Sequence, residues 1–199
     1  MKYGQHKASY YVINGITFFR VIAAPFLLAL LFTGRYDIFK WLLGVSFFTD
    51  LIDGYLARKY KVTSIFGARL DSLGDDLTVL IGIIGLVVMK PAFIKQEIVL
   101  LILLLVLFLV QIIYAFIRYG KMTNFHTYLA KTAAVLQGVF LLLTFFTERT
   151  NLFLFFAATI ITALELIEET ILISLLPEWE ANVKGLYWVI KKKKQGTKR

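Results

Sequence analysis

Four aspartates in the sequence have a spacing that could build a metal site. Asp50 and Asp53 are three residues apart, and Asp71 and Asp75 are four residues apart. In a helix, either spacing puts both side chains on one face. Four carboxylates facing one another in a low dielectric would repel, and hard divalent cations with oxygen ligands resolve that repulsion. We therefore expect these four aspartates to bind Mg²⁺ or Mn²⁺.

Two adjacent divalent ions suit chemistry on a diphosphate. They offset its charge and stabilise the attacking and leaving oxygens of an in-line displacement. Gly54 and Ala57 leave space for a nucleotide beside the helix, and Arg58 is placed to bind a phosphate oxygen. The only histidines, His6 and His126, have no second ligand at metal spacing. Carboxylates are therefore the expected metal ligands.

The composition assigns these residues to a membrane protein. The 199 residues are 59% hydrophobic, with a mean hydropathy of +0.74 and no cysteine. Apolar residues come in blocks of about 20, which is typical of transmembrane helices. A soluble enzyme, a disordered chain and a disulfide-stapled module are excluded, as are thiolate zinc sites and redox dithiols. Six spans are predicted, over Ile16–Phe32, Ile38–Leu56, Ser72–Met89, Ile98–Ile117, Tyr128–Thr147 and Leu152–Leu176.

The predicted fold is an all-α integral membrane protein, a six-transmembrane-helix bundle. Most of the 22 lysines and arginines lie at the termini and in the second and fourth loops, which predicts that both termini are cytoplasmic. Residues 1–199 are expected to form a single membrane domain with interfacial flanking helices at 1–13 and 177–199.

The carboxy-terminal flank has an amphipathic pattern. After Pro177, apolar residues recur at helical spacing, and a run of lysines follows. This helix either binds anionic lipid or only fixes the topology. The net charge of +9 does not indicate nucleic acid, because no basic and aromatic stripe lies on a soluble face. The residues of the pattern are Trp179, Val183, Leu186 and Ile190, followed by Lys191–Lys194.

The aspartates belong to a longer pattern of eight fixed positions. In order these are Asp50, Asp53, Gly54, Ala57, Arg58, Gly67, Asp71 and Asp75. In residue type and spacing the pattern resembles the signature of the CDP-alcohol phosphotransferases. The segment Asn14–Arg20 with Pro25 also resembles the first span of that family, more loosely.

The resemblance implies a membrane enzyme of phospholipid biosynthesis. Such an enzyme moves a phosphatidyl group from CDP-diacylglycerol to a small alcohol and releases CMP, at the cytoplasmic face of the cell (inner) membrane. It implies that Asp50, Asp53, Asp71 and Asp75 hold two metal ions and that Asp75 is also the general base. Gly54, Ala57, Arg58 and Gly67 match the positions that contact the nucleotide. Family members are commonly homodimers, and the sequence leaves the oligomeric state open.

The acceptor alcohol is less well defined. Glycerol 3-phosphate or inositol phosphate would need cations near the metals. Arg118 and Lys131 are favoured because they lie at span ends, and His126 is either interfacial or lines the pocket. The full set of candidate cations on the cytoplasmic side is Arg20, Arg69, Arg118, Lys121 and Lys131. The positive-inside rule explains the basic residues equally well. A segment from Asn124 to Gln137 faintly resembles phosphatidylglycerophosphate synthases, with altered spacing. The last span contains three glutamates, Glu165, Glu168 and Glu169. They either bind a hydroxyl-rich or cationic acceptor, or pair with an arginine, or face water.

Two other functions stay open. The same motif fits transfer from soluble CDP-choline or CDP-ethanolamine to a lipid alcohol. A non-catalytic cation carrier would also place acids in a membrane. Such a carrier does not explain the fixed glycines, alanine and arginine, and it predicts acids spread over the membrane depth rather than clustered between two spans. The sequence therefore favours the phosphatidyltransferase.

Overall fold

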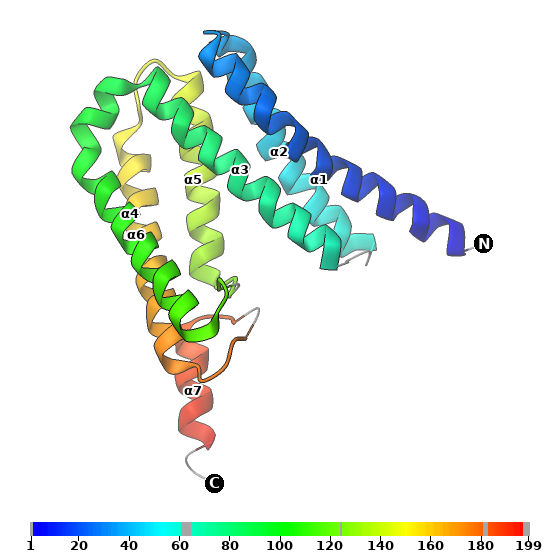
Figure 1. Cartoon of the computed structure of the whole chain (residues 1–199), viewed down its shortest axis with the longest axis vertical. Coiled ribbons are helices and arrows are strands. Elements are labelled where there is room, and N and C mark those ends of the chain that lie inside the picture. The colour runs from blue at the N-terminus through cyan, green and yellow to red at the C-terminus, as the bar shows by residue number, and fades with distance from the viewer. Residues whose placement is uncertain (1, 61–64, 124, 181–182, 197–199) are drawn as a thin grey trace. The chain divides into compact units, whose positions relative to one another are not determined.

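The computed structural model describes residues 2–60, 65–123, 125–180 and 183–196. Within several helices only the backbone is described, at 2–14, 50–51, 53–60, 65–73, 75–76 and 193–196. The all-α prediction is confirmed for the described residues, which contain no strand. The helices are α1 Lys2–Phe32, α2 Tyr36–Tyr60, α3 Ile65–Met89, α4 Pro91–Tyr119, α5 Tyr128–Phe146, α6 Leu152–Leu175 and α7 Leu186–Gly196 (Figure 1).

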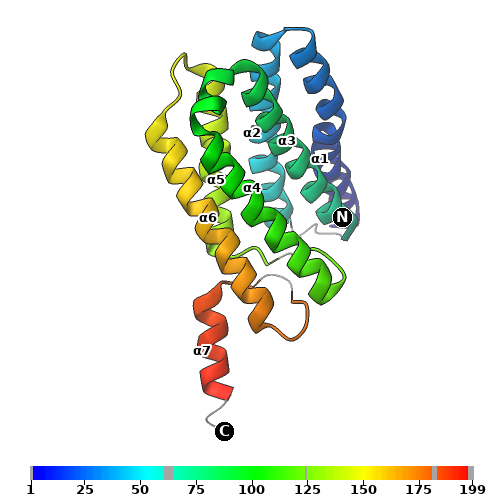
Figure 2. The same cartoon turned by 60° about the vertical axis from the view of Figure 1, so that its left-hand side comes forward.

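The helices fall into two compact units. Unit 1 consists of Met1–Ala92 with Leu141–Glu148, and unit 2 of Phe93–Phe140 with Arg149–Arg199. Within unit 1, α1 packs against both α2 and α3, and the three helices lie side by side in both views (Figures 1 and 2). The expectation of a single membrane domain stays a prediction.

The core of unit 1 is formed by apolar side chains of α1 to α3 and the end of α5. Phe39 of α2 is fully buried, and its ring meets the ring of Phe145 edge-on at 5.5 Å. Both rings lie against Gly85 of α3, where a Cβ would come within 2.8 Å of Phe39 and 3.0 Å of Phe145. The absence of a side chain at Gly85 therefore sets how closely α3 packs in this unit.

Unit 2 is held by aromatic and polar contacts between α4, α5 and α6. The ring of Phe93 meets that of Phe155 at 5.0 Å and that of Phe140 at 6.0 Å. The Gln137 amide donates to Thr162 Oγ1 at 2.6 Å. Hydrogen bonds of this kind join helices where apolar packing alone gives little preference for one neighbour over another in lipid.

Three described helices are long and apolar enough to cross a membrane. They are Gly15–Phe32, Pro91–Tyr119 and Tyr128–Phe146, and Leu77–Met89 is a shorter apolar helix. Large apolar side chains along α4 are exposed, Val99 to 74% and Ile117 to 79%, as expected for a surface that faces lipid rather than water. The count of six spans and the cytoplasmic termini stay predictions.

The amino-terminal flank is helical, and its interfacial position stays a prediction, whereas the carboxy-terminal flank differs from its predicted form. Residue 2 already begins α1, so the amino-terminal flank continues the first apolar helix without a break. In the carboxy-terminal flank, the predicted helical spacing is wrong for Trp179 and Val183, because α7 begins only at Leu186. Gly185 has a φ of 144°, outside the helical region, and Val183 is buried in a connecting segment.

Candidate active site

The eight signature positions lie on two consecutive helices of unit 1. Helix α2 ends at Tyr60 and α3 begins at Ile65, so the short connection makes the two helices antiparallel neighbours. At 1.5 Å per residue, Asp53 lies about 10 Å before the end of α2 and Asp71 about 9 Å after the start of α3. By the same rise, Asp50 and Asp75 each lie about 15 Å from these ends. Measured from the two helix ends that the connection joins, Asp53 and Asp71 thus lie at similar distances, and so do Asp50 and Asp75.

The four-carboxylate donor set fits hard divalent cations. Carboxylate oxygens are the ligands that Mg²⁺ and Mn²⁺ prefer. The side chains of all eight signature residues lie outside the described part, so the ligands and the contacts of Gly54, Ala57, Arg58 and Gly67 stay predictions. Among the side chains that are described, no group of three or more histidines or acids is placed to hold a metal ion.

A buried arginine lies beside the signature segment of α3. Arg20 of α1 is 1% exposed, and Thr17, one turn earlier, is 4% exposed. A Cβ built at Gly74 would be 3.5 Å from the Cβ, Nε and Cζ atoms of Arg20. Gly74 lies directly before Asp75 in α3. The guanidinium therefore lies against the backbone of the segment that carries Asp71 and Asp75.

The sequence predicts Arg20 inside the first span as a candidate cation for an acceptor phosphate, but the contact of Arg20 with α3 was not predicted. The sequence offered two signals, the three-residue spacing of Thr17 and Arg20 in an apolar span and a glycine between two of the aspartates. A charged group inside an apolar span normally faces a polar cavity and a partner. Neither signal identifies α3 as the neighbour, because that contact depends on tertiary packing.

The three predicted acceptor residues lie in unit 2. The Arg118 guanidinium, in the last turn of α4, donates to Leu176 O at 3.3 and 3.4 Å, where it caps the carboxyl end of α6. Lys131 Nζ lies 5.6 Å from the centre of the Tyr128 ring, and His126 has a φ of 52°. The aspartates belong to unit 1, so the grouping of these residues around an acceptor stays a prediction.

Two glutamates of α6, Glu168 and Glu169, accept hydrogen bonds from other segments of unit 2. Glu169 is 8% exposed, which contradicts the water-facing alternative for this residue. Its Oε2 accepts hydrogen bonds from Gln111 Nε2 at 2.7 Å and from Thr123 Oγ1 at 2.9 Å. Glu168 Oε1 accepts the Leu186 N–H at 2.9 Å. These glutamates join α6 to α4, to the segment after α4 and to α7.

Comparison with known proteins points to one family. Residues 10–169 match the family model of the CDP-alcohol phosphatidyltransferases. The chain is 36% identical over 74 residues to a CDP-diacylglycerol–glycerol-3-phosphate 3-phosphatidyltransferase of Wigglesworthia glossinidia brevipalpis, covering 35% of this chain and 40% of that protein. It is 37% identical over 82 residues to the protein of the same name in Haemophilus influenzae, covering 39% and 44%.

A third relative is a Schizosaccharomyces pombe fusion of cardiolipin synthase (CMP-forming) and a mitochondrial hydrolase. It is 45% identical over 65 residues, which cover 31% of this chain and 10% of that protein. The chain thus spans less than half the length of these curated relatives. No solved structure matches it. Since the family model matches most of the chain and includes all eight signature positions, the chain belongs to the CDP-alcohol phosphatidyltransferase family.

Proposed function

We propose that this protein transfers a phosphatidyl group from CDP-diacylglycerol to glycerol 3-phosphate and releases CMP. The observation that supports the proposal is that all eight signature positions lie on the consecutive helices α2 and α3, two of the four aspartates on each, within the residues that match the family model. Glycerol 3-phosphate is favoured over other small alcohols because the relatives in Wigglesworthia and Haemophilus are named for it.

The proposed reaction is a direct displacement at the lipid-side phosphorus of the donor. Asp50, Asp53, Asp71 and Asp75 would hold two Mg²⁺ or Mn²⁺ ions, which supply charge neutralisation at the diphosphate. Asp75 takes the proton of the acceptor hydroxyl, whose oxygen then forms a bond to that phosphorus. The bond from phosphorus to the CMP oxygen breaks, and CMP leaves with the electron pair.

The remaining signature residues have donor-binding roles in this proposal. Arg58 binds a phosphate oxygen, and the small residues Gly54, Ala57 and Gly67 leave space for the nucleotide. Arg20 adds a fixed positive charge beside the α3 segment that carries two of the aspartates. We further propose that the protein is a homodimer in the cell (inner) membrane with this site at the cytoplasmic face.

The proposal is tested by CMP release from purified protein in detergent. CDP-diacylglycerol and Mg²⁺ or Mn²⁺ are supplied with one acceptor at a time: glycerol 3-phosphate, inositol, inositol phosphate, serine, choline or ethanolamine. We expect release that is stimulated by glycerol 3-phosphate and stopped by EDTA. Stimulation by another acceptor alone would overturn the acceptor assignment. Activity only with CDP-choline or CDP-ethanolamine and diacylglycerol would overturn the donor assignment.

A further inference from the structure

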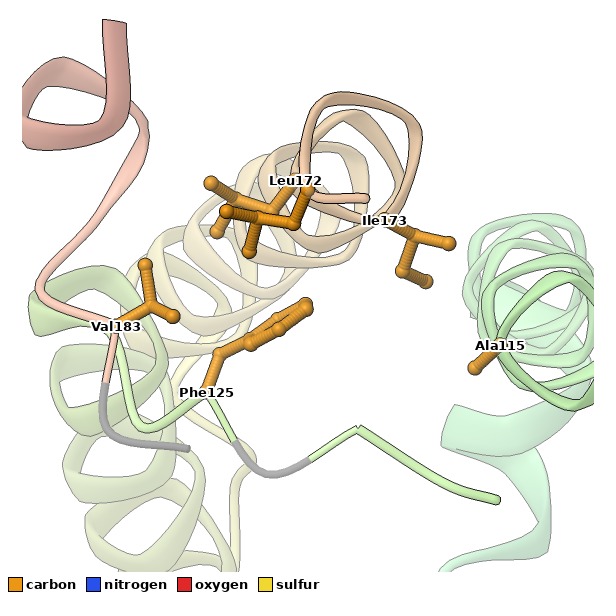
Figure 3. Packing of buried hydrophobic residues seen from close by; sticks show 6 residues of the cluster. Ala115, Phe125, Leu172, Ile173 and Val183 are labelled. Atoms are coloured by element: carbon orange, nitrogen blue, oxygen red, sulfur yellow. The ribbon is translucent and has the colours of Figure 1, made fainter. Parts of the chain in front are cut away.

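Two connecting segments of unit 2 meet over the carboxyl end of α6. Phe125, between α4 and α5, and Val183, before α7, pack in one buried cluster with Leu172 and Ile173 of α6 (Figure 3). Close to this cluster, the backbone N–H of residue 128 donates to the carbonyl of residue 184 at 3.2 Å. The start of α5 is therefore fixed beside the start of α7.

This junction brings three amphipathic aromatic side chains together at the surface. The ring of Tyr128 lies 5.3 Å from that of Trp188, which lies 5.5 Å from that of Tyr187. Their exposed fractions are 55%, 45% and 66%, in the order Tyr128, Trp188, Tyr187. Exposed tyrosine and tryptophan are typical of the boundary between hydrocarbon and headgroups.

Lysines lie next to these rings. Lys131 Nζ is 5.6 Å from the Tyr128 ring centre, and Lys191 Nζ is 5.9 Å from that of Tyr187. Lys192 is exposed and follows Trp188 by four residues, so the two share a helix face. The basic–aromatic surface defined in this way consists of Tyr128, Lys131, Tyr187, Trp188, Lys191 and Lys192.

The opposite face of α7 is anchored to unit 2. Leu186 and Val189 pack against the buried cluster, and the Leu186 N–H donates to Glu168 Oε1 at 2.9 Å. This anchoring leaves Tyr187, Trp188 and Lys191 on the outward side. Lys191 and Lys192 therefore belong to a helix that is anchored to unit 2 after the end of α6.

We propose that the basic–aromatic surface binds the headgroup phosphates of anionic phospholipids. The lysines are complementary in charge to those phosphates. The adjacent aromatic rings suit the boundary between headgroups and hydrocarbon. A soluble phosphate has no apolar part that these rings could contact. The surface lies in unit 2 and contains none of the signature residues, so it is independent of the proposed transferase reaction.

The test uses Trp188 as a reporter in the full chain. The protein has three tryptophans, and the substitutions Trp41→Phe and Trp179→Phe leave Trp188 as the only one. The reporter protein is reconstituted in two bilayers, one with brominated phosphatidylglycerol and one with the same fraction of brominated phosphatidylcholine. The quenching of Trp188 fluorescence is then compared between the two bilayers. We expect the anionic lipid to quench at least about twofold more strongly, with the difference decreasing as salt is raised.

Two charge variants locate the effect. Lys191→Gln with Lys192→Gln should bring the ratio of the two quenching values close to one. Arg35→Gln with Lys95→Gln removes the same charge from exposed positions elsewhere and should leave the ratio unchanged. Thermal unfolding of each variant shows that it is folded, and the salt titration of the unmodified reporter provides an independent test if a variant is not.

Several results would overturn the proposal. Equal quenching by both lipids, or a ratio that does not respond to salt, would exclude anionic lipid as the ligand. An equal loss in both charge variants would attribute the effect to net charge rather than to this surface. Loss of the ratio on adding millimolar inorganic phosphate, at constant ionic strength, would identify a soluble anion as the ligand.

Discussion

At the scale of single residues, Asp75 has the most demanding role, because the same carboxylate is expected to bind metal and to accept the proton. Its place on a helix could be predicted from the sequence, and the face that its spacing predicts it to share with Asp71 stays a prediction. The role of the neighbouring residue Gly74 could not be predicted from spacing along the chain. Its importance arises from contact with Arg20 of another helix, which no local pattern encodes.

Replacing Asp75 by asparagine should lower turnover by about 10²- to 10⁴-fold, because the amide cannot accept the proton. The adjacent Asp76 has no place in the signature, so Asp76→Asn is the matched control and should keep most of the activity. CMP release measures both variants, and thermal unfolding in detergent checks that each is folded. Near wild-type turnover in Asp75→Asn would contradict its assignment as the base.

Substitutions at Gly74 test the role of Arg20. A Cβ at Gly74 makes ordinary 3.5 Å contacts with Arg20, so Gly74→Ala should keep most of the activity. The larger side chain in Gly74→Leu must displace the guanidinium and should lower turnover by about 10- to 100-fold, because small displacements near a reacting centre are costly. Equal activity of the two folded variants would show that the position of Arg20 does not matter.

At the scale of helices, the apolar blocks predict which segments are helical better than they predict where the helices end. The block at Ile98–Ile117 lies within α4, which begins at Pro91 and ends at Tyr119. The polar residues Lys95, Gln96 and Glu97 of its second turn belong to the helix although they interrupt the apolar run. At the carboxy terminus, burial of Val183 and the backbone of Gly185 override the apparent helical spacing.

Packing of α3 in unit 1 should be sensitive at Gly85. Gly85→Ala places a Cβ 2.8 to 3.0 Å from two aromatic rings and should cost about 1–3 kcal/mol in the free energy of unfolding. Gly44→Ala is the control, since its Cβ would be 3.7 Å from the nearest atom. Thermal unfolding in detergent compares the two. A melting temperature for Gly85→Ala at or above that of the control would contradict this packing.

At the scale of the whole molecule, composition was sufficient to predict an all-α membrane protein, because blocks of apolar residues can be buried only in lipid or in a large core. The number of membrane spans is harder to predict from the composition. Helix α6 carries three glutamates, and charged residues are costly inside a hydrocarbon core, so its apolar character alone does not establish it as a span. Two of them, Glu168 and Glu169, accept hydrogen bonds from other segments of unit 2, and such tertiary contacts cannot be predicted from a hydropathy pattern along the chain.

The predicted topology can be tested with single cysteines, because the natural chain has none. Thr197→Cys should be labelled by a membrane-impermeant maleimide only from the cytoplasmic side, and Glu148→Cys only from the opposite side. Intact cells and inverted membrane vesicles provide the two sides. The predicted topology has one span, Leu152–Leu176, between the two positions. Labelling of both positions from the same side would contradict that topology.

The central claim is that the phosphatidyl group moves from CDP-diacylglycerol to glycerol 3-phosphate at the four-aspartate site. Its most direct test is transfer of label from radioactive glycerol 3-phosphate into the lipid extract, measured together with CMP. We predict one labelled lipid for each CMP released by the wild-type protein, and loss of both products in folded Asp75→Asn. CMP release without labelled lipid, or labelled lipid formed equally by the variant, would contradict the account.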